Sequence, residues 1–262
     1  MVSFQRRMIG RYPGAVIGSG APVIVLTGLS PSTGIGGDGF VRGSAAPVAA
    51  VHGRQIVVIN RRPGLASSMT MADLAADLAD SLRESFDGPV DVLGESTGGS
   101  IAQQLAADHP DVVGRLILIS TGCRLSESTR RFQARVADLV ESGDYRTAMG
   151  MTAADLVPRG LRHLVYAGGW VFAHRAIDDV SAPDLVITTR AEDGFDLRNA
   201  PTIKAPTLIV GGRRDRFYDA DLYAETAALI PGSTLLMIPR HGHITVLSSA
   251  RTRMAVAGFL AA

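Results

Sequence analysis

A single serine stands among glycines in the stretch Gly94-Glu95-Ser96-Thr97-Gly98-Gly99, directly after the apolar run VDVL. Glycine and serine both favour tight turns and helix starts, so the stretch could be turn chemistry alone. Alternatively, a strained strand-to-helix turn of the form G-x-S-x-G holds the serine hydroxyl clear of the backbone as a nucleophile. Because a serine hydroxyl is a weak nucleophile at neutral pH, this interpretation requires a base and an acid that orients the base.

Candidates for the acid and the base follow two later apolar runs. Asp215 comes after TLIVGG, and His241 and His243 come after LLMIP. Because parallel strands end at one edge of a sheet, we expect these side chains near Ser96. The order serine, aspartate, histidine is the one associated with this type of turn. His241 competes with His243 as the base, and Asp219 is the alternative acid.

The elements that must position these residues are visible as periodic patterns. Runs that are apolar on both faces, as in the central strands of a parallel sheet, lie at 23–27, 55–60, 90–94, 115–120, 207–211 and 234–238. Amphipathic helices are expected between several of them, at 70–82, 100–108 and 221–230. The first of these helices begins with a possible capping box, Thr70-Met-Ala-Asp73. The alternation predicts an α/β fold with a doubly wound, mostly parallel sheet.

The alternation fails between residues 123 and 201, where helical patterns replace strands. The expected helices lie at 128–142, 145–156 and 161–176. We therefore expect a core domain of residues 1–122 and 202–262, with residues 123–201 as a helical cap over the strand ends. Such a cap should select the substrate. Its expected lining is Met149, Tyr166 and Trp170, with Phe132, Met151 and Phe172 as further candidates.

In these motifs and their order the sequence resembles the α/β-hydrolase family over nearly its whole length. The matching pieces are GESTGG, the acid in GGRRDRF, the histidine in HGH and the turn NRRPG. The resemblance implies a serine esterase or lipase-like enzyme in which Ser96 attacks an acyl carbonyl, His243 carries the proton and Asp215 orients the imidazole. It favours His243 over His241, because the family places a glycine just before this histidine.

The resemblance also implies an oxyanion hole. Its donors would be the backbone N–H groups of Thr97, after the nucleophile, and of Leu29, after the first strand of the core. Where the family often has His-Gly, this chain has Thr27-Gly28, so that Ser30 is an alternative second donor. The implied reaction is hydrolysis of an ester, lactone or thioester bond in a small to medium, mainly apolar substrate. A non-catalytic ligand sensor with the same fold is the alternative.

An NADP-dependent oxidoreductase is a further alternative. Gly34, Gly36 and Gly39 satisfy GxGxxG, the pattern of dinucleotide-binding loops. In such loops the glycines follow the strand at once, whereas here six residues separate Thr27 from Gly34. The Tyr-x-x-x-Lys pair of short-chain reductases is impossible, because an alanine lies four residues before the single lysine, Lys204.

Composition limits the partners that the protein can have. With 26 Lys plus Arg against 25 Asp plus Glu, no overall field favours nucleic acid or an acidic membrane. Cys123 is the only cysteine, which excludes an internal disulfide and a Cys-rich zinc site, and there is no HExxH motif. Neither a signal peptide nor a membrane-spanning run is apparent. We expect a cytoplasmic monomer or homodimer that acts on a small molecule with no cofactor and no metal.

Overall fold

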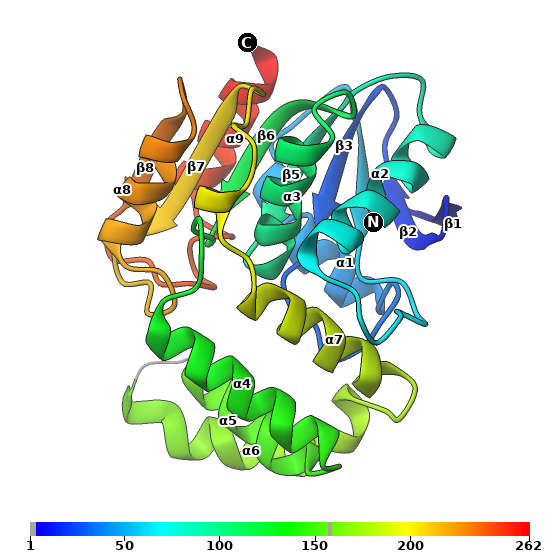
Figure 1. Ribbon diagram of the computed structural model, residues 1–262. Helices are drawn as coiled ribbons and strands as arrows, with labels where there is room; N and C mark the ends of the chain where they lie inside the picture. Colours follow the sequence, from blue (N-terminus) through cyan, green and yellow to red (C-terminus); the bar gives the residue numbers. More distant parts are fainter. Residues whose placement is uncertain (1–3, 157–158) are drawn as a thin grey trace.

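The computed structural model describes residues 4–156 and 159–262, which form an eight-stranded sheet with helices on both sides (Figure 1). The strand order is β1-β2-β4-β3-β5-β6-β7-β8. The strands are β1 (Gln5–Ile9), β2 (Tyr12–Ile17), β3 (Ala21–Leu26), β4 (Arg54–Ile59), β5 (Val90–Glu95), β6 (Val113–Ile119), β7 (Thr207–Gly212) and β8 (Thr234–Ile238). Strands β3 to β8 are parallel, whereas β1 and β2 form an antiparallel hairpin at one edge.

All six expected core strands are present, with ends that differ from the expected ones by two residues or fewer. The edge hairpin of β1 and β2 was not expected. Four of the five β1 residues are exposed, and β2 contains Pro13 and Gly14, which are depleted in strands. The hairpin therefore lacks the apolar pattern from which the core strands were predicted.

Two layers of helices confirm the doubly wound α/β architecture. One face of the sheet packs against α2 (Met71–Ser85), α3 (Thr97–Asp108) and α8 (Ala220–Leu229), and the other against α1 (Asp38–Ser44) and α9 (Ala250–Ala261). Successive side chains of a strand point to opposite faces of the sheet. Ile24 and Leu26 accordingly belong to one buried cluster, and Val23 and Val25 to the other. The sheet is thus buried on both sides, as its apolar runs predict.

Between β6 and β7 the described residues form four α-helices, which we call the four-helix insertion. They are α4 (Glu127–Glu141), α5 (Tyr145–Asp155), α6 (Arg162–Ala176) and α7 (Ser181–Asp193). In Figure 1 these helices lie beyond the ends to which the strand arrows point, and α7 contacts both α4 and the core helix α2. Helix α7 was not expected, because it buries polar residues such as Asp184, Thr188 and Glu192 and so shows no apolar stripe.

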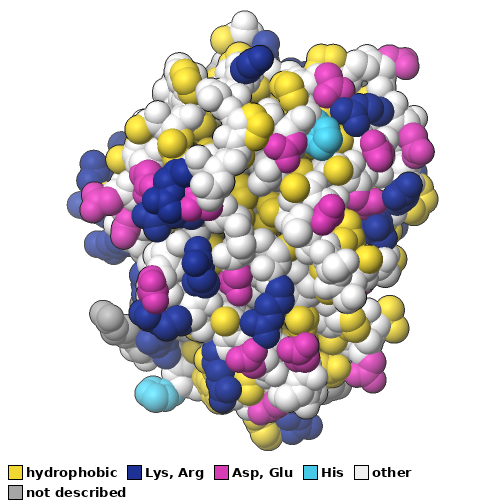
Figure 2. Space-filling model, viewed as in Figure 1, with side chains coloured by type: hydrophobic (Ala, Val, Ile, Leu, Met, Phe, Trp, Pro, Cys, Tyr) yellow, Lys and Arg dark blue, Asp and Glu magenta, His cyan; other side chains and the backbone are white. Residues whose placement is uncertain are grey.

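The surface carries both signs of charge. On the face shown in Figure 2, arginine and lysine side chains are interspersed with aspartate and glutamate, in keeping with the formal net charge of +1. Among the helices of the described residues, none is both long enough and apolar enough to cross a bilayer.

Candidate active site

Ser96 lies at the tight turn between β5 and α3 and has backbone angles of φ 50° and ψ −122°. A positive φ is strained for a residue other than glycine, and such strain often marks functional positions. The flanking glycines are required by close packing. A Cβ atom at Gly98 would lie 2.4 Å from the carbonyl oxygen of Leu26, and one at Gly94 would lie 2.6 Å from that of Gly98.

The structure brings the three expected side chains together at the carboxyl ends of β5, β7 and β8. The Nε2 atom of His243 is 3.0 Å from Oγ of Ser96. On the other side of the ring, Nδ1 of His243 is 3.0 Å from Oδ2 and 3.2 Å from Oδ1 of Asp215. These distances match hydrogen bonds from a serine to an imidazole and from the imidazole to a carboxylate.

Asp215 is buried and accepts hydrogen bonds from four donors. Besides His243, the amides of Phe217 and Tyr218 donate to Oδ1 at 2.9 and 3.2 Å, and the Tyr223 hydroxyl donates to Oδ2 at 2.9 Å. Burial opposes ionisation of this carboxyl, but His243 and the other donors outweigh it and lower its pKa below the usual value. Asp215 therefore stays ionised and can hold the imidazole with its Nδ1–H toward the carboxylate.

His243 is fixed by further contacts that the sequence did not reveal. Its carbonyl oxygen accepts a hydrogen bond from Oγ of Ser120 at 2.6 Å. The ring of Phe217 lies 4.6 Å from the imidazole, centroid to centroid. Ser120 and Tyr223 belong to a predicted strand and a predicted helix, but nothing in the sequence shows that these positions meet the histidine and the aspartate.

The alternative acid and the alternative base have other hydrogen-bond partners. His241 places Nδ1 2.9 Å from the carbonyl oxygen of Pro239. Asp219 caps α8, where it accepts from the amide of Leu222 at 2.9 Å. The geometry thus favours His243 and Asp215.

The loop after β3 passes close to the serine, as the expected oxyanion donors require. A Cβ atom at Gly28 would lie 3.3 Å from Cβ of Ser96, so that only glycine fits there without displacement. Within the described residues, the amides of Leu29 and Thr97 form no hydrogen bond to another protein atom. Ser30 is buried, and its carbonyl accepts from Arg61 at 2.5 Å.

The glycine-rich stretch after β3 is held by the residues that follow β4. The Nδ2 atom of Asn60 donates to the carbonyls of Ser32 and Gly34 at 2.8 and 2.9 Å. Arg61 contacts the carbonyl of Ser30 in the same loop. The NRRPG turn therefore shapes the loop that lies against Ser96. This role of Asn60 and Arg61 was not expected from the sequence.

Two buried acids lie at the turn that carries the serine. Glu95, the preceding residue, is 4% exposed, and its Oε1 atom has no hydrogen-bond partner among the described residues. Burial raises the pKa of Glu95 well above its usual value, which favours the protonated form. The second acid, Glu192, reaches the first turn of α3 from α7 and accepts from the side chain of Thr97. Nothing in the sequence indicates this contact.

The expected lining residues lie in the four-helix insertion. Met149 belongs to a buried cluster against which Leu29 and Phe132 pack. The ring of Tyr166 packs against Gly150, and Trp170 is 40% exposed with the Arg146 guanidinium 4.6 Å from its ring centroid. Among the described residues, Met149, Tyr166 and Trp170 form no hydrogen bond or ring contact with Ser96 or His243. The ring of Phe132 contacts Phe217, which in turn contacts the imidazole of His243.

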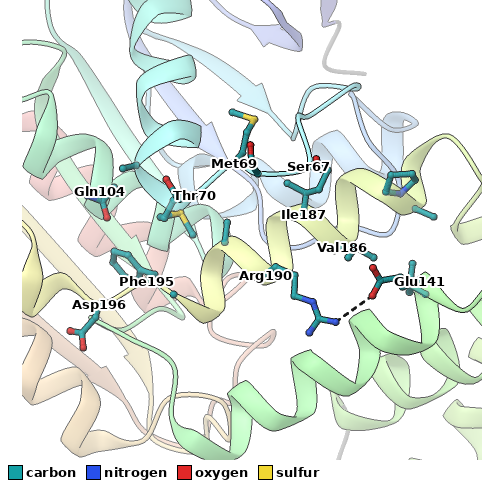
Figure 3. Close-up of a pocket in the computed structure, with 18 of the residues that line it drawn as sticks. Ser67, Met69, Thr70, Gln104, Glu141, Val186, Ile187, Arg190, Phe195 and Asp196 are labelled. Atoms are coloured by element: carbon teal, nitrogen blue, oxygen red, sulfur yellow. Dashed lines mark ion pairs between the residues drawn. The ribbon is translucent and has the colours of Figure 1, made fainter.

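Two cavities flank α7. The first cavity has a volume of about 760 Å³ and runs along α7 (Figure 3). Its lining includes Met69, which precedes α2, Phe195 and the ion pair between Arg190 and Glu141. None of the three triad candidates lines it. The other cavity, of about 40 Å³, adjoins both expected oxyanion donors, Leu29 and Thr97, and is mainly apolar. Ser96, Asp215 and His243 do not line the smaller cavity either, so this cavity adjoins the expected oxyanion donors but not the triad side chains.

The described residues show no group of three or more His, Cys, Asp or Glu side chains that could hold a metal ion. Cys123 is fully buried, and burial raises the pKa of its thiol. A buried thiol of raised pKa is a poor nucleophile, so Ser96 is the better candidate.

Comparison with known proteins identifies the family. A model described as the alpha/beta hydrolase family matches residues 23–257, and the chain therefore belongs to this family. This assignment leaves the dinucleotide-binding alternative without support.

Individual relatives include several hydrolases. A Klebsiella pneumoniae protein named "Putative carbamate hydrolase RutD" is 27% identical over 254 residues, which cover 89% of this chain and 88% of that protein. Among solved structures, a thermophilic esterase from Thermogutta terrifontis has a TM-score of 0.70 at 21% identity and covers 98% of both chains. The enol-lactonase from Burkholderia xenovorans has a TM-score of 0.73 at 18% identity, covering 98% of this chain and 100% of its own. The family and the relatives indicate a hydrolase, and the two structures support the fold.

Proposed function

We propose that this protein is a serine hydrolase that cleaves an ester-type bond through an acyl-enzyme on Ser96. The observation that carries the proposal is the continuous hydrogen-bonded chain from Ser96 through His243 to Asp215, with 3.0 Å at both junctions of the imidazole. This arrangement can remove the proton from an alcohol at neutral pH, because the carboxylate stabilises the imidazolium that forms.

In the first half of the reaction, Oγ of Ser96 attacks the acyl carbon while its proton passes to Nε2 of His243. The tetrahedral intermediate collapses, the bond to the leaving oxygen breaks, and His243 returns the proton to that oxygen. In the second half a water molecule gives a proton to His243 and attacks the acyl-enzyme. The bond to Ser96 then breaks, the proton returns to Oγ, and the products are a carboxylic acid and an alcohol.

The negative charge of the tetrahedral intermediate needs donors that are already in place. The amides of Thr97 and Leu29 are suited to this role, because neither is used elsewhere in the described residues and the loop at Gly28 lies against Ser96. Loss of one such donor typically raises the barrier by about 3 kcal/mol.

We propose a small, apolar acyl group as the substrate's reacting part, because the cavity that adjoins the expected oxyanion donors is small and apolar. The cavity of about 40 Å³ beside Leu29 and Thr97 is lined mainly by apolar side chains, among them Leu65, Leu74 and Ile101. We propose that residues 123–201 act as a cap that completes the substrate pocket, with Phe132 packed against Phe217, whose ring lies beside the imidazole of His243. Esters, lactones and thioesters of short acyl groups are the first substrates to test.

The test is hydrolysis of p-nitrophenyl esters from acetate to octanoate by the wild type and by Ser96→Ala. We expect turnover of the short esters that falls by at least about a thousandfold in the variant, because the nucleophile is lost. Mass spectrometry with a fluorophosphonate should place the covalent adduct on Ser96 in the wild type alone.

The opposite result would favour a sensor. A wild type that neither hydrolyses short esters, thioesters and lactones nor reacts with the fluorophosphonate, but is stabilised by a small molecule, would contradict the enzymatic proposal. Binding without turnover would then be the function of the pocket.

A further inference from the structure

Glu192 is fully buried at the end of α7 and reaches across to the turn that carries the serine. Its Oε2 atom accepts from Oγ1 of Thr97 at 2.7 Å, and its Oε1 atom accepts from Oγ of Ser100 at 2.8 Å. A third donor, Nε2 of Gln133 on α4, lies 3.3 Å from Oε2. One carboxyl thus joins two helices of the four-helix insertion to the first turn of α3.

This carboxyl has no arginine or lysine partner among the described residues. Burial raises its pKa, although the three hydrogen-bond donors act in the opposite direction. A buried acid without a cation costs free energy unless its hydrogen bonds are complete. Here the donors are two hydroxyls and one amide, and two of the three belong to α3.

Thr97 links this contact to the chemistry. Its side chain is held by Glu192, and its amide is an expected donor to the oxyanion, directly beside the strained Ser96. Without this hydrogen bond the backbone of Thr97 is less restrained, and any displacement of it moves the amide N–H of the same residue. Small displacements of this kind matter, because catalysis depends on donors already aimed at the developing charge.

We propose that Glu192 is a positioning residue for the reaction assigned to Ser96. By holding Thr97 and Ser100 it fixes the first turn of α3, and so couples the placement of α7 to the reactivity of the serine. This inference goes beyond the proposed function and rests on it.

The four-helix insertion offers a control. Asp144 is an acid at the start of α5, where its carboxylate accepts from the amide of Thr147 at 3.1 Å. Among the described residues it forms no hydrogen bond or ion pair with α7 or α3. Removal of Asp144 therefore weakens the start of α5 but leaves the contacts of Glu192 and Thr97 in place.

The first experiment compares the turnover of p-nitrophenyl acetate by Glu192→Ala, Glu192→Gln and Asp144→Ala. We expect Glu192→Ala to lower kcat roughly 10- to 100-fold with KM within about threefold, as for a misplaced catalytic group. Glu192→Gln should restore most of kcat, because an amide can both accept from and donate to the two hydroxyls. Asp144→Ala should keep kcat within about threefold of the wild type. Equal losses of kcat in both alanine variants, or a change in KM alone, would overturn the proposal.

A second readout does not depend on turnover. The amides of Gly99 and Ser100 donate to the carbonyl of Ser96 at 2.7 and 3.2 Å. Their hydrogen exchange should be about tenfold faster in Glu192→Ala than in the wild type and unchanged in Asp144→Ala. Unchanged exchange in Glu192→Ala would overturn the positioning role. An inert wild type would instead contradict the proposed function, and the exchange comparison would still decide whether Glu192 holds α3.

Discussion

At the scale of single residues, Asp215 shows how a buried carboxylate stays ionised. Four different groups donate to it, and two of them are backbone amides of the loop that follows. Tyr223 supplies a further side-chain donor from α8. The orientation of His243 therefore depends on a set of bonds behind the carboxylate as well as on the carboxylate itself.

The substitution Tyr223→Phe tests this dependence. Loss of a hydrogen bond to a charged group should lower the free energy of unfolding by about 1.5 kcal/mol. The less restrained carboxylate should lower kcat/KM by roughly threefold to tenfold. Tyr145→Phe is the control, because Tyr145 donates to Asp179 at the surface, 2.8 Å away. Unchanged kcat/KM in Tyr223→Phe would show that the remaining donors suffice to orient His243.

The sequence could predict the residues that carry a local signature. Ser96 is flanked by glycines in a G-x-S-x-G motif, and His243 and Asp215 each follow an apolar run that predicts a strand. Glu192 and Tyr223 lack such a signature. Each is an ordinary polar residue on a helix, and its role is set by which face of that helix meets the loops around the serine.

At the scale of elements, α3 is pressed against the end of β3, from which the oxyanion loop starts. The contact is made by Gly98, where an added Cβ would lie 2.4 Å from the carbonyl oxygen of Leu26 and 2.5 Å from that of Thr27. Both neighbours are backbone atoms and cannot turn aside. The glycine thus fixes the distance between the two segments that bear the expected oxyanion donors.

We expect Gly98→Ala to lower the free energy of unfolding by about 3 kcal/mol and to abolish ester hydrolysis, because α3 must move away from β3. Gly258→Ala is the matched control, since Gly258 lies within α9 and an added Cβ there meets nothing within 4 Å. It should raise stability by about 0.5 to 1 kcal/mol. Urea unfolding and p-nitrophenyl acetate turnover would check both. Full activity in Gly98→Ala would contradict the argument.

The elements that the sequence predicted well are those with a simple pattern. Helix α2 begins at the expected capping box, in which Thr70 and Asp73 bond each other's backbone amides. Helix α7 went unpredicted because both its faces are occupied, one by the core and one by the insertion. Its two buried acids, Asp184 and Glu192, accept hydrogen bonds from residues far away in the sequence, which periodicity does not reveal.

At the scale of the whole molecule, Asp77 joins three segments far apart in sequence. From α2 it accepts from Arg62 in the NRRPG turn at 2.6 Å, and from Tyr12 and Arg11 in the edge hairpin at 2.9 and 2.8 Å. Burial opposes ionisation of Asp77, but these donors outweigh it and lower its pKa. The ionised carboxylate therefore stabilises the folded state.

The stability should accordingly depend on pH through Asp77. Because its folded pKa lies below the unfolded value of about 3.9, its contribution is complete above that pH and is lost as the pH falls through the folded pKa. We expect Asp77→Asn to cost about 2 kcal/mol at neutral pH and progressively less below about pH 4. Asp111→Asn, which removes an exposed ion pair with Arg83, should cost about 0.5 kcal/mol or less. A deficit of Asp77→Asn that persists unchanged in acid would contradict this account.

The four-helix insertion leaves the sheet after β6 and returns at β7, and these two strands are direct neighbours. Its two ends thus enter through a gap of about 5 Å, the spacing of adjacent strands. A segment attached in this way can be lengthened, shortened or exchanged during evolution without loss of any backbone hydrogen bond between the strands. A replacement for the four-helix insertion must, however, carry an acid at the position of Glu192. Otherwise the side chains of Thr97 and Ser100 lose their hydrogen-bond acceptor.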